Sequence, residues 1–203
     1  MKSILIVLVI IVIGGIVWYG IQTKPDASVP QANVSDVNTN TTSENEIKAD
    51  ESANKPAISK KEIDNANVKI AFKGFGPGKV HNGSFTKVDS KLAFDGDSMK
   101  GDVVVDMTSL TTDNSEKLTP HLKSDAFFDV AKYPTASFKV ISLKDGKLSG
   151  MMTVHGMSKN VSFDVKSSDT QLSSTFNIDM KEFGIIQTFA NEVIELTVTV
   201  PLK

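Results

Sequence analysis

Apolar and polar residues alternate with a period of two in several segments between residues 58 and 203, and this pattern most constrains the fold. Within one segment, Phe176, Ile178 and Met180 alternate with Asn177 and Asp179. The same alternation recurs in segments 68–73, 103–108, 161–166 and 194–200. Successive side chains of a β-strand point to opposite faces, so each segment predicts a strand with one face in a core.

Turn signals divide the predicted strands. Asp95-Gly96 and Asp145-Gly146 are two-residue hairpin signals, because a type I′ turn requires positive φ at both central residues. Gly156 indicates a third chain reversal. We therefore expect about eight antiparallel strands with mostly short connections, arranged as a barrel or a sandwich. Long helices between the predicted strands are absent, which argues against a parallel α/β fold.

One short stretch interrupts the strand pattern. Thr119 followed by Pro120 resembles a helix N-cap with proline in the first turn. We expect a single short helix that begins there and continues through Ser124.

The amino terminus has a different composition from the predicted strands. Residues 4–21 form an uncharged run of 18 residues, preceded by Lys2. As a helix the run would reach about 27 Å, close to the apolar thickness of a bilayer. We interpret residues 1–22 as a single-pass membrane anchor with a cytoplasmic N-terminus, which places the rest of the chain outside the cytoplasm. A cleaved secretory signal, which would release the chain, is the alternative.

Residues 23–57 have the composition of a linker. They contain three lysines and six acidic residues, a net charge of −3, and no aromatic residue. Such a segment buries too little apolar surface to offset the entropy cost of ordering. We predict a disordered acidic linker here, followed by one domain over residues 58–203.

Composition excludes several classes of function. The chain has no cysteine and, by inspection of the sequence, no arginine, and its net charge is −2. A disulfide framework, thiolate metal site or lipid-modified cysteine is therefore excluded, and nothing indicates nucleic-acid binding. His81, His121 and His155 lie far apart in the sequence. We expect no metal, no cofactor and no catalytic residue.

The 11 phenylalanines are the more informative residues. Most belong in a core, but a barrel of about eight strands is also wide enough to enclose one slender ligand. Small residues such as Ser149, Gly150 and Ser174 leave room for a cavity. An apolar wall with few polar groups suits a lipid-like molecule.

Five segments resemble motifs of the YceI-like family of exported proteins. They are Asn82–Phe85, Thr108–Thr112, His121–Phe138, Gly150–Lys159 and Lys181–Ile185. The resemblance implies an antiparallel lipocalin-like β-barrel that binds a polyisoprenoid or a similar amphiphile, with the tail in the bore and the head at the rim. It leaves open the headgroup, the delivery partner, the envelope layer and the oligomeric state.

Our hypothesis is that eight phenylalanines supply much of the cavity wall. They are Phe72, Phe85, Phe94, Phe127, Phe128, Phe138, Phe163 and Phe176. The expected function is sequestration or transport of a lipid by a membrane-tethered extracytoplasmic domain. A ligand-free barrel that acts as an envelope stress or protein-interaction module is the main alternative, followed by a lipid-modifying enzyme.

Overall fold

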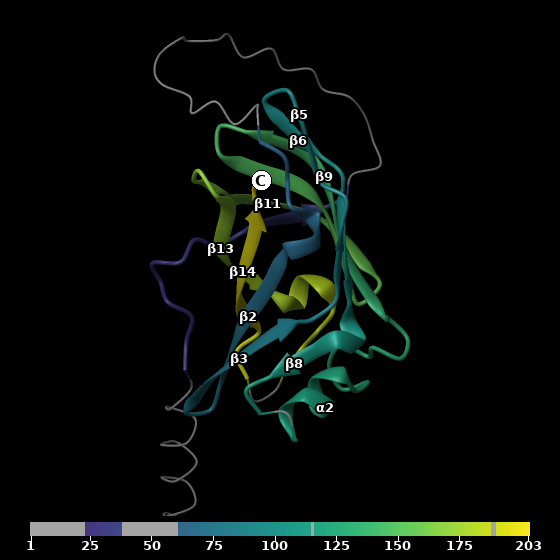
Figure 1. The fold of residues 1–203 in the computed structure, drawn as a ribbon. Helices are drawn as coiled ribbons and strands as arrows, with labels where there is room; N and C mark the ends of the chain where they lie inside the picture. Colours follow the sequence, from purple (N-terminus) through teal and green to yellow (C-terminus); the bar gives the residue numbers. More distant parts are fainter. Residues whose placement is uncertain (1–22, 38–60, 115, 188–189) are drawn as a thin grey trace, which may run out of the picture.

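The computed structural model describes residues 23–37, 61–114, 116–187 and 190–203 (Figure 1). The predicted anchor over residues 1–22 lies outside these residues, as does most of the predicted linker. Within the described ranges, no helix is long and apolar enough to cross a bilayer.

Two six-stranded sheets and one short hairpin form the domain. The first sheet has the order β1 (Asn33–Asp36), β11 (Met157–Asp164), β10 (Lys147–Val154), β9 (Thr135–Lys144), β7 (Asp102–Asp106) and β4 (Val88–Ser90). The second has the order β12 (Lys166–Ser167), β13 (Gln171–Asp179), β14 (Val193–Pro201), β2 (Lys69–Gly76), β3 (Lys79–Phe85) and β8 (Leu110–Thr112). The hairpin pairs β5 (Ala93–Asp95) with β6 (Ser98–Lys100).

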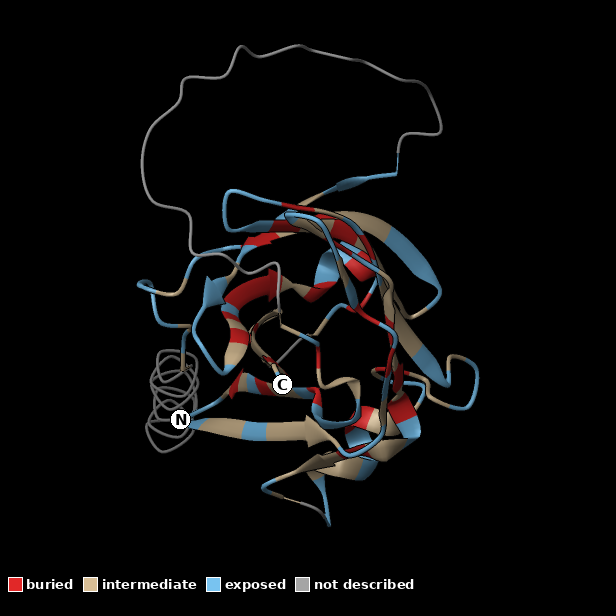
Figure 2. Ribbon diagram, turned by 45° about the horizontal axis from the view of Figure 1, so that its top comes forward, coloured by how far each residue is buried: buried red, intermediate tan, exposed pale blue. Residues whose placement is uncertain are grey.

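Among the described residues, four short helical segments lie between strands. They are η1 (Asn65–Asn67), η2 (Met107–Ser109), α2 (Leu118–Lys123) and η3 (Met180–Phe183). In Figure 1, α2 lies near β8 and the β2–β3 turn at one end of the domain, whereas the β5–β6 hairpin lies at the opposite end. Figure 2 shows buried residues along the sheet faces that enclose the core.

The all-β prediction is confirmed, whereas the predicted barrel is confirmed only in part. The two sheets form separate ladders and do not close. The strand segments are also more numerous than predicted, because irregular residues break the longer runs. The predicted strand over residues 99–107, for example, is divided at Gly101, which has φ of 114°. A Cβ there would lie 2.0 Å from the Lys91 carbonyl oxygen, so this bend requires glycine.

Two of the three predicted chain reversals occur as two-residue turns at the predicted positions, one at Asp145-Gly146 and one at His155-Gly156. Asp145 and Gly146 have φ of 51° and 73°, and His155 and Gly156 have φ of 51° and 75°. Each pair connects two antiparallel strands in register, as a type I′ turn requires. The β5–β6 turn is shifted by one residue from its predicted position, since Asp95 already pairs with Ser98.

The helix occurs where it was predicted, but its predicted cap is wrong. It begins at Leu118, one residue before Thr119. The Thr119 hydroxyl accepts a hydrogen bond from the Thr112 backbone N–H at 3.1 Å, and the two threonine hydroxyls lie 2.8 Å apart. Thr119 therefore fixes the helix to β8 instead of capping it.

The prediction of a disordered linker is wrong for residues 23–37. The backbone N–H of Ala32 donates to the carbonyl oxygen of Asn177, and the N–H of Asn177 donates to that of Pro30, both at 2.8 Å. The following residues form β1, which pairs with β11. These residues bridge the two sheets by adding to strand edges, a backbone interaction that needs little apolar side-chain area. We call residues 23–37 the N-terminal strap.

Candidate functional site

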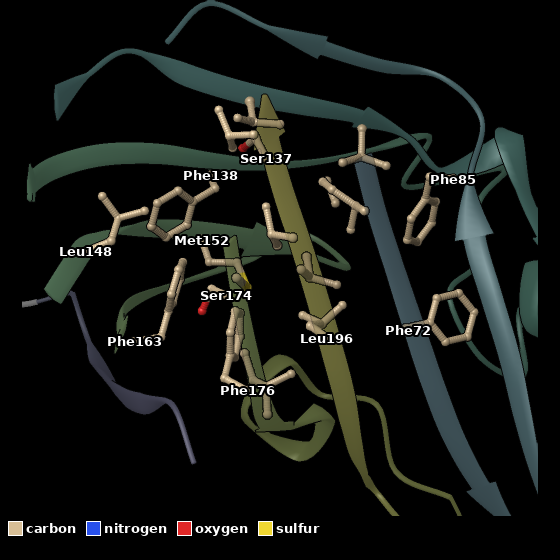
Figure 3. A pocket seen from close by; sticks show the side chains of 18 of the residues that line it. Phe72, Phe85, Ser137, Phe138, Leu148, Met152, Phe163, Ser174, Phe176 and Leu196 are labelled. Atoms are coloured by element: carbon tan, nitrogen blue, oxygen red, sulfur yellow. The ribbon is translucent and has the colours of Figure 1, made fainter. Parts of the chain in front are cut away.

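An apolar cavity of about 150 Å³ lies between the two sheets (Figure 3). Only three of its lining residues have polar side chains, namely Ser137, Ser173 and Ser174. The Ser174 hydroxyl donates to the Asp164 carbonyl oxygen at 2.6 Å, so this hydroxyl is already satisfied by the protein. The wall therefore offers a ligand mainly apolar contacts.

The structure brings six of the eight predicted phenylalanines to this wall. They are Phe72, Phe85, Phe128, Phe138, Phe163 and Phe176. The rings of Phe163 and Phe176 stack with centroids 4.2 Å apart, and Phe138 lies 5.6 Å from Phe163. In Figure 3 these three side chains form a continuous group on one side of the cavity.

Phe94 and Phe127 do not line the cavity. Phe94 lies in the β5–β6 hairpin, which belongs to neither large sheet, and packs against the core from there. Phe127 contacts Phe128 edge to face at 4.6 Å and is half-buried. Aromatic character alone therefore does not identify a lining residue, because the orientation of the local backbone decides where the ring points.

Sequence reasoning also missed part of the wall. Strand β14 contributes Ile194, Leu196, Val198 and Val200, whose alternation was visible in the sequence. The site prediction considered aromatic residues only, so it left this row out. Phe183, which follows β13 and is fully buried, is a further lining residue.

Two glycines allow aromatic rings to lie close to the backbone of the wall. A Cβ at Gly83 would lie 2.2 Å from Cζ of Phe72, and one at Gly150 would lie 2.4 Å from Cζ of Phe138. Gly150 was predicted to leave room in the barrel. Its space is instead occupied by the Phe138 ring.

No titratable side chain lines the cavity. The His81 ring nitrogen Nδ1 lies 2.9 Å from Oδ1 of Asp113, outside the cavity lining. The Asn82 backbone N–H and the His81 side chain hold the pKa of Asp113 below its usual value. His121 is exposed on α2, and His155 occupies a turn against the Tyr133 ring. Among the described residues, no group of three or more metal-ligating side chains of His, Cys, Asp or Glu occurs.

The volume of the cavity limits the size of a group that fits inside it. An engineered apolar cavity of about the same volume stays dry and binds benzene. The observed space therefore accommodates a small apolar group or a short segment of a branched chain. Among the described residues, no acid or base that could exchange a proton with a ligand lines the cavity.

Comparison of the chain with known proteins identifies its family. The YceI-like domain family matches residues 62–203, most of the chain. The chain belongs to the YceI-like family. Its solved relatives include BcnA of Burkholderia cenocepacia, at 16% identity and a TM-score of 0.58, over 69% of this chain and 99% of that one.

A second solved relative is described as a polyisoprenoid binding domain from Saccharophagus degradans implicated in plant cell wall breakdown. It is 13% identical, with a TM-score of 0.55, over 70% of this chain and 97% of that one. At these identities, both comparisons establish a shared fold.

Sequence relatives of the YceI-like chain include UPF0312 proteins. One from Vibrio campbellii is 32% identical over 108 residues, which cover 49% of this chain and 55% of the relative. One from Vibrio cholerae is 29% identical over 132 residues, which cover 56% of this chain and 69% of the relative. The match thus spans little more than half the length of the first relative.

Proposed function

We propose that this protein binds a polyisoprenoid or a similar amphiphile, with part of the apolar tail inside the cavity between the two sheets. The observation that carries the proposal is the cavity of about 150 Å³, whose wall is apolar except for three serines. The structural relative described as a polyisoprenoid binding domain supports the same class of ligand.

The cavity must widen to take more than a short segment of such a tail. Four methionines line it, namely Met99, Met107, Met152 and Met180. Methionine is unbranched and adapts its rotamers to irregular shapes, so these side chains can reposition around a ligand. We expect the bound cavity to be larger than the observed one.

Gly74 leaves open space on the face of β2 that also carries Phe72. Phe72 faces the cavity, and Gly74 is on the same face of the strand. A Cβ added at Gly74 would meet nothing within 4 Å. We propose that the tail extends from Phe72 past Gly74 towards the β2–β3 turn, with the polar head outside.

The proposal includes a membrane tether formed by residues 4–21 and an extracytoplasmic position of the domain. Its support is the uncharged run of 18 residues, long enough to cross a bilayer as a helix. We propose a binding role without enzymatic activity, since no acid, base or nucleophile of the described residues lines the cavity except serine hydroxyls.

Organic extraction of the purified full-length protein followed by mass spectrometry tests the proposal. We expect a co-purifying isoprenoid or another long-chain lipid, and uptake of added polyprenyl phosphate after the native lipid is removed. Bovine serum albumin carried through the same extraction controls for non-specific lipid. A protein that holds no lipid and takes up none would contradict the proposal and favour a ligand-free module.

A further inference from the structure

The first residue of the strap is fixed to the β2–β3 turn. Thr23 donates through its hydroxyl to the carbonyl oxygens of Gly76 at 2.9 Å and Lys79 at 3.1 Å. Its backbone N–H also donates to the Gly76 oxygen, at 3.2 Å. In the sequence, only Gln22 separates Thr23 from the apolar run over residues 4–21. Ile21 is two residues from Thr23, so covalent geometry alone limits the separation of their Cα atoms to about 7 Å, and the apolar run ends within that distance of a residue fixed to the β2–β3 turn.

Other segments at this end of the domain are linked to one another. The Gln187 side chain donates to the Ala126 carbonyl oxygen at 3.3 Å, and the Asn191 N–H donates to the Phe75 oxygen at 2.8 Å. These bonds place the chain between η3 and β14 beside both the α2 turn and the end of β2. The same end of the domain is recognised in Figure 1 by α2 and β8.

This end carries both apolar and basic groups. Ile186 is 72% exposed, more than any of the other exposed large hydrophobic residues described. Lys24 and Lys79 are exposed beside the β2–β3 turn. The carboxylate of Asp26 accepts hydrogen bonds from the backbone and hydroxyl of Ser28. An exposed isoleucine and lysines at the same end of a domain suit the boundary between acyl chains and anionic headgroups.

We propose that this end of the domain rests on the bilayer that holds residues 4–21, with Ile186 at the lipid surface. The inference rests on the proposed membrane tether and on the proposed lipid binding. The open space next to Gly74 then faces the same bilayer. A lipid tail passes between the membrane and the cavity at this end without exposure to bulk water.

Single-cysteine labelling tests the orientation, because the natural chain contains no cysteine. Full-length Ile186→Cys would carry an environment-sensitive fluorophore in vesicles of phosphatidylethanolamine and phosphatidylglycerol that contain brominated lipid. Ile141→Cys is the matched control, since Ile141 is also an exposed isoleucine, at 64%, and lies on β9. The hydrogen bond from the Leu143 N–H to Ser98 places that part of β9 beside the β5–β6 hairpin, at the opposite end.

We expect severalfold stronger quenching at residue 186 than at residue 141. Insertion of ten glycine and serine residues between residues 22 and 23 should reduce the difference, because it lengthens the connection to the membrane. Equal quenching at both positions in vesicle-bound protein would overturn the orientation and leave the tether intact. Protein that fails to float with the vesicles would overturn the tether as well. If protein that does not float with the vesicles still takes up lipid, the proposed lipid binding is retained and only the proposed tether and orientation are rejected.

Discussion

Substitution of Val198 by phenylalanine should fill the cavity from β14. Val198 lines the cavity, and its cross-strand neighbours Ser174 and Ile70 line it too. An internal void costs about 24 cal/mol per Å³, so a cavity of about 150 Å³ lowers the stability of the ligand-free protein by roughly 3.6 kcal/mol. A phenyl ring that fills half of it should recover up to about 2 kcal/mol.

The expected result is a ligand-free variant at least as stable as the natural protein that no longer takes up polyprenyl phosphate. Urea unfolding of the chain from Thr23 onwards, followed by far-ultraviolet circular dichroism, measures the stability, since the single tryptophan is Trp18. Thr199→Phe is the matched control. Thr199 is the next residue of the same strand, does not line the cavity, and should leave lipid uptake unchanged.

A loss of stability in Val198→Phe together with retained lipid binding would refute this reasoning. A ring forced into a well-packed core destabilises a protein by about 1–3 kcal/mol. If Val198→Phe lost stability by that amount and still bound lipid, the space in front of Val198 would be neither a void nor the binding site.

Three further predictions concern the wall, the surface and the strap. Gly150→Ala should lower the free energy of unfolding by about 1–3 kcal/mol and by more than Gly83→Ala, because its Cβ would also meet a backbone oxygen at 2.5 Å; urea unfolding of both variants checks this order. The pKa of Asp113 is lower in the folded than in the unfolded protein, so the ionised carboxylate stabilises the fold fully above about pH 4 and loses this effect as the pH falls further. The difference in unfolding free energy between the natural protein and Asp113→Asn should therefore shrink in acid. An unchanged difference from pH 7 to pH 2 would contradict this prediction. Removal of residues 23–37 should lower the stability by at least about 4 kcal/mol, because it breaks four hydrogen bonds to Asn177, worth about 1 kcal/mol each, and the pairing of β1 with β11; thermal unfolding against the chain that starts at Thr23 measures the loss.

The sequence predicted the class of fold through local chemistry. Alternation in Phe176, Ile178 and Met180 was sufficient to assign strand β13 and its inner face, since Phe176 and Ile178 of the strand are buried, as is Met180 at the start of η3. Asp145-Gly146 was sufficient to assign a hairpin, because few residue pairs adopt positive φ in succession. These features depend on neighbours in the chain, so no knowledge of the tertiary structure was needed.

The burial of Asn177 could not be predicted from its neighbours in the sequence. By alternation this residue should face solvent, yet it is 5% exposed. Its side-chain amide donates to the Val29 carbonyl oxygen at 3.0 Å, a contact across 148 positions of the chain. The strap has a polar composition and is ordered by the edges of two sheets, which the sequence of the strap does not reveal.

The sequence by itself determined an all-β domain with an apolar interior, a short helix and an uncharged amino-terminal run. Six of the eight phenylalanines that it singled out lie in the wall of the observed cavity. Only the tertiary structure decided that Phe94 and Phe127 stay outside, that the row from Ile194 to Val200 completes the wall, and that the sheets remain separate. The physical reason is that alternation depends on the geometry of one strand, whereas a cavity depends on the distance between strands that are far apart in the chain.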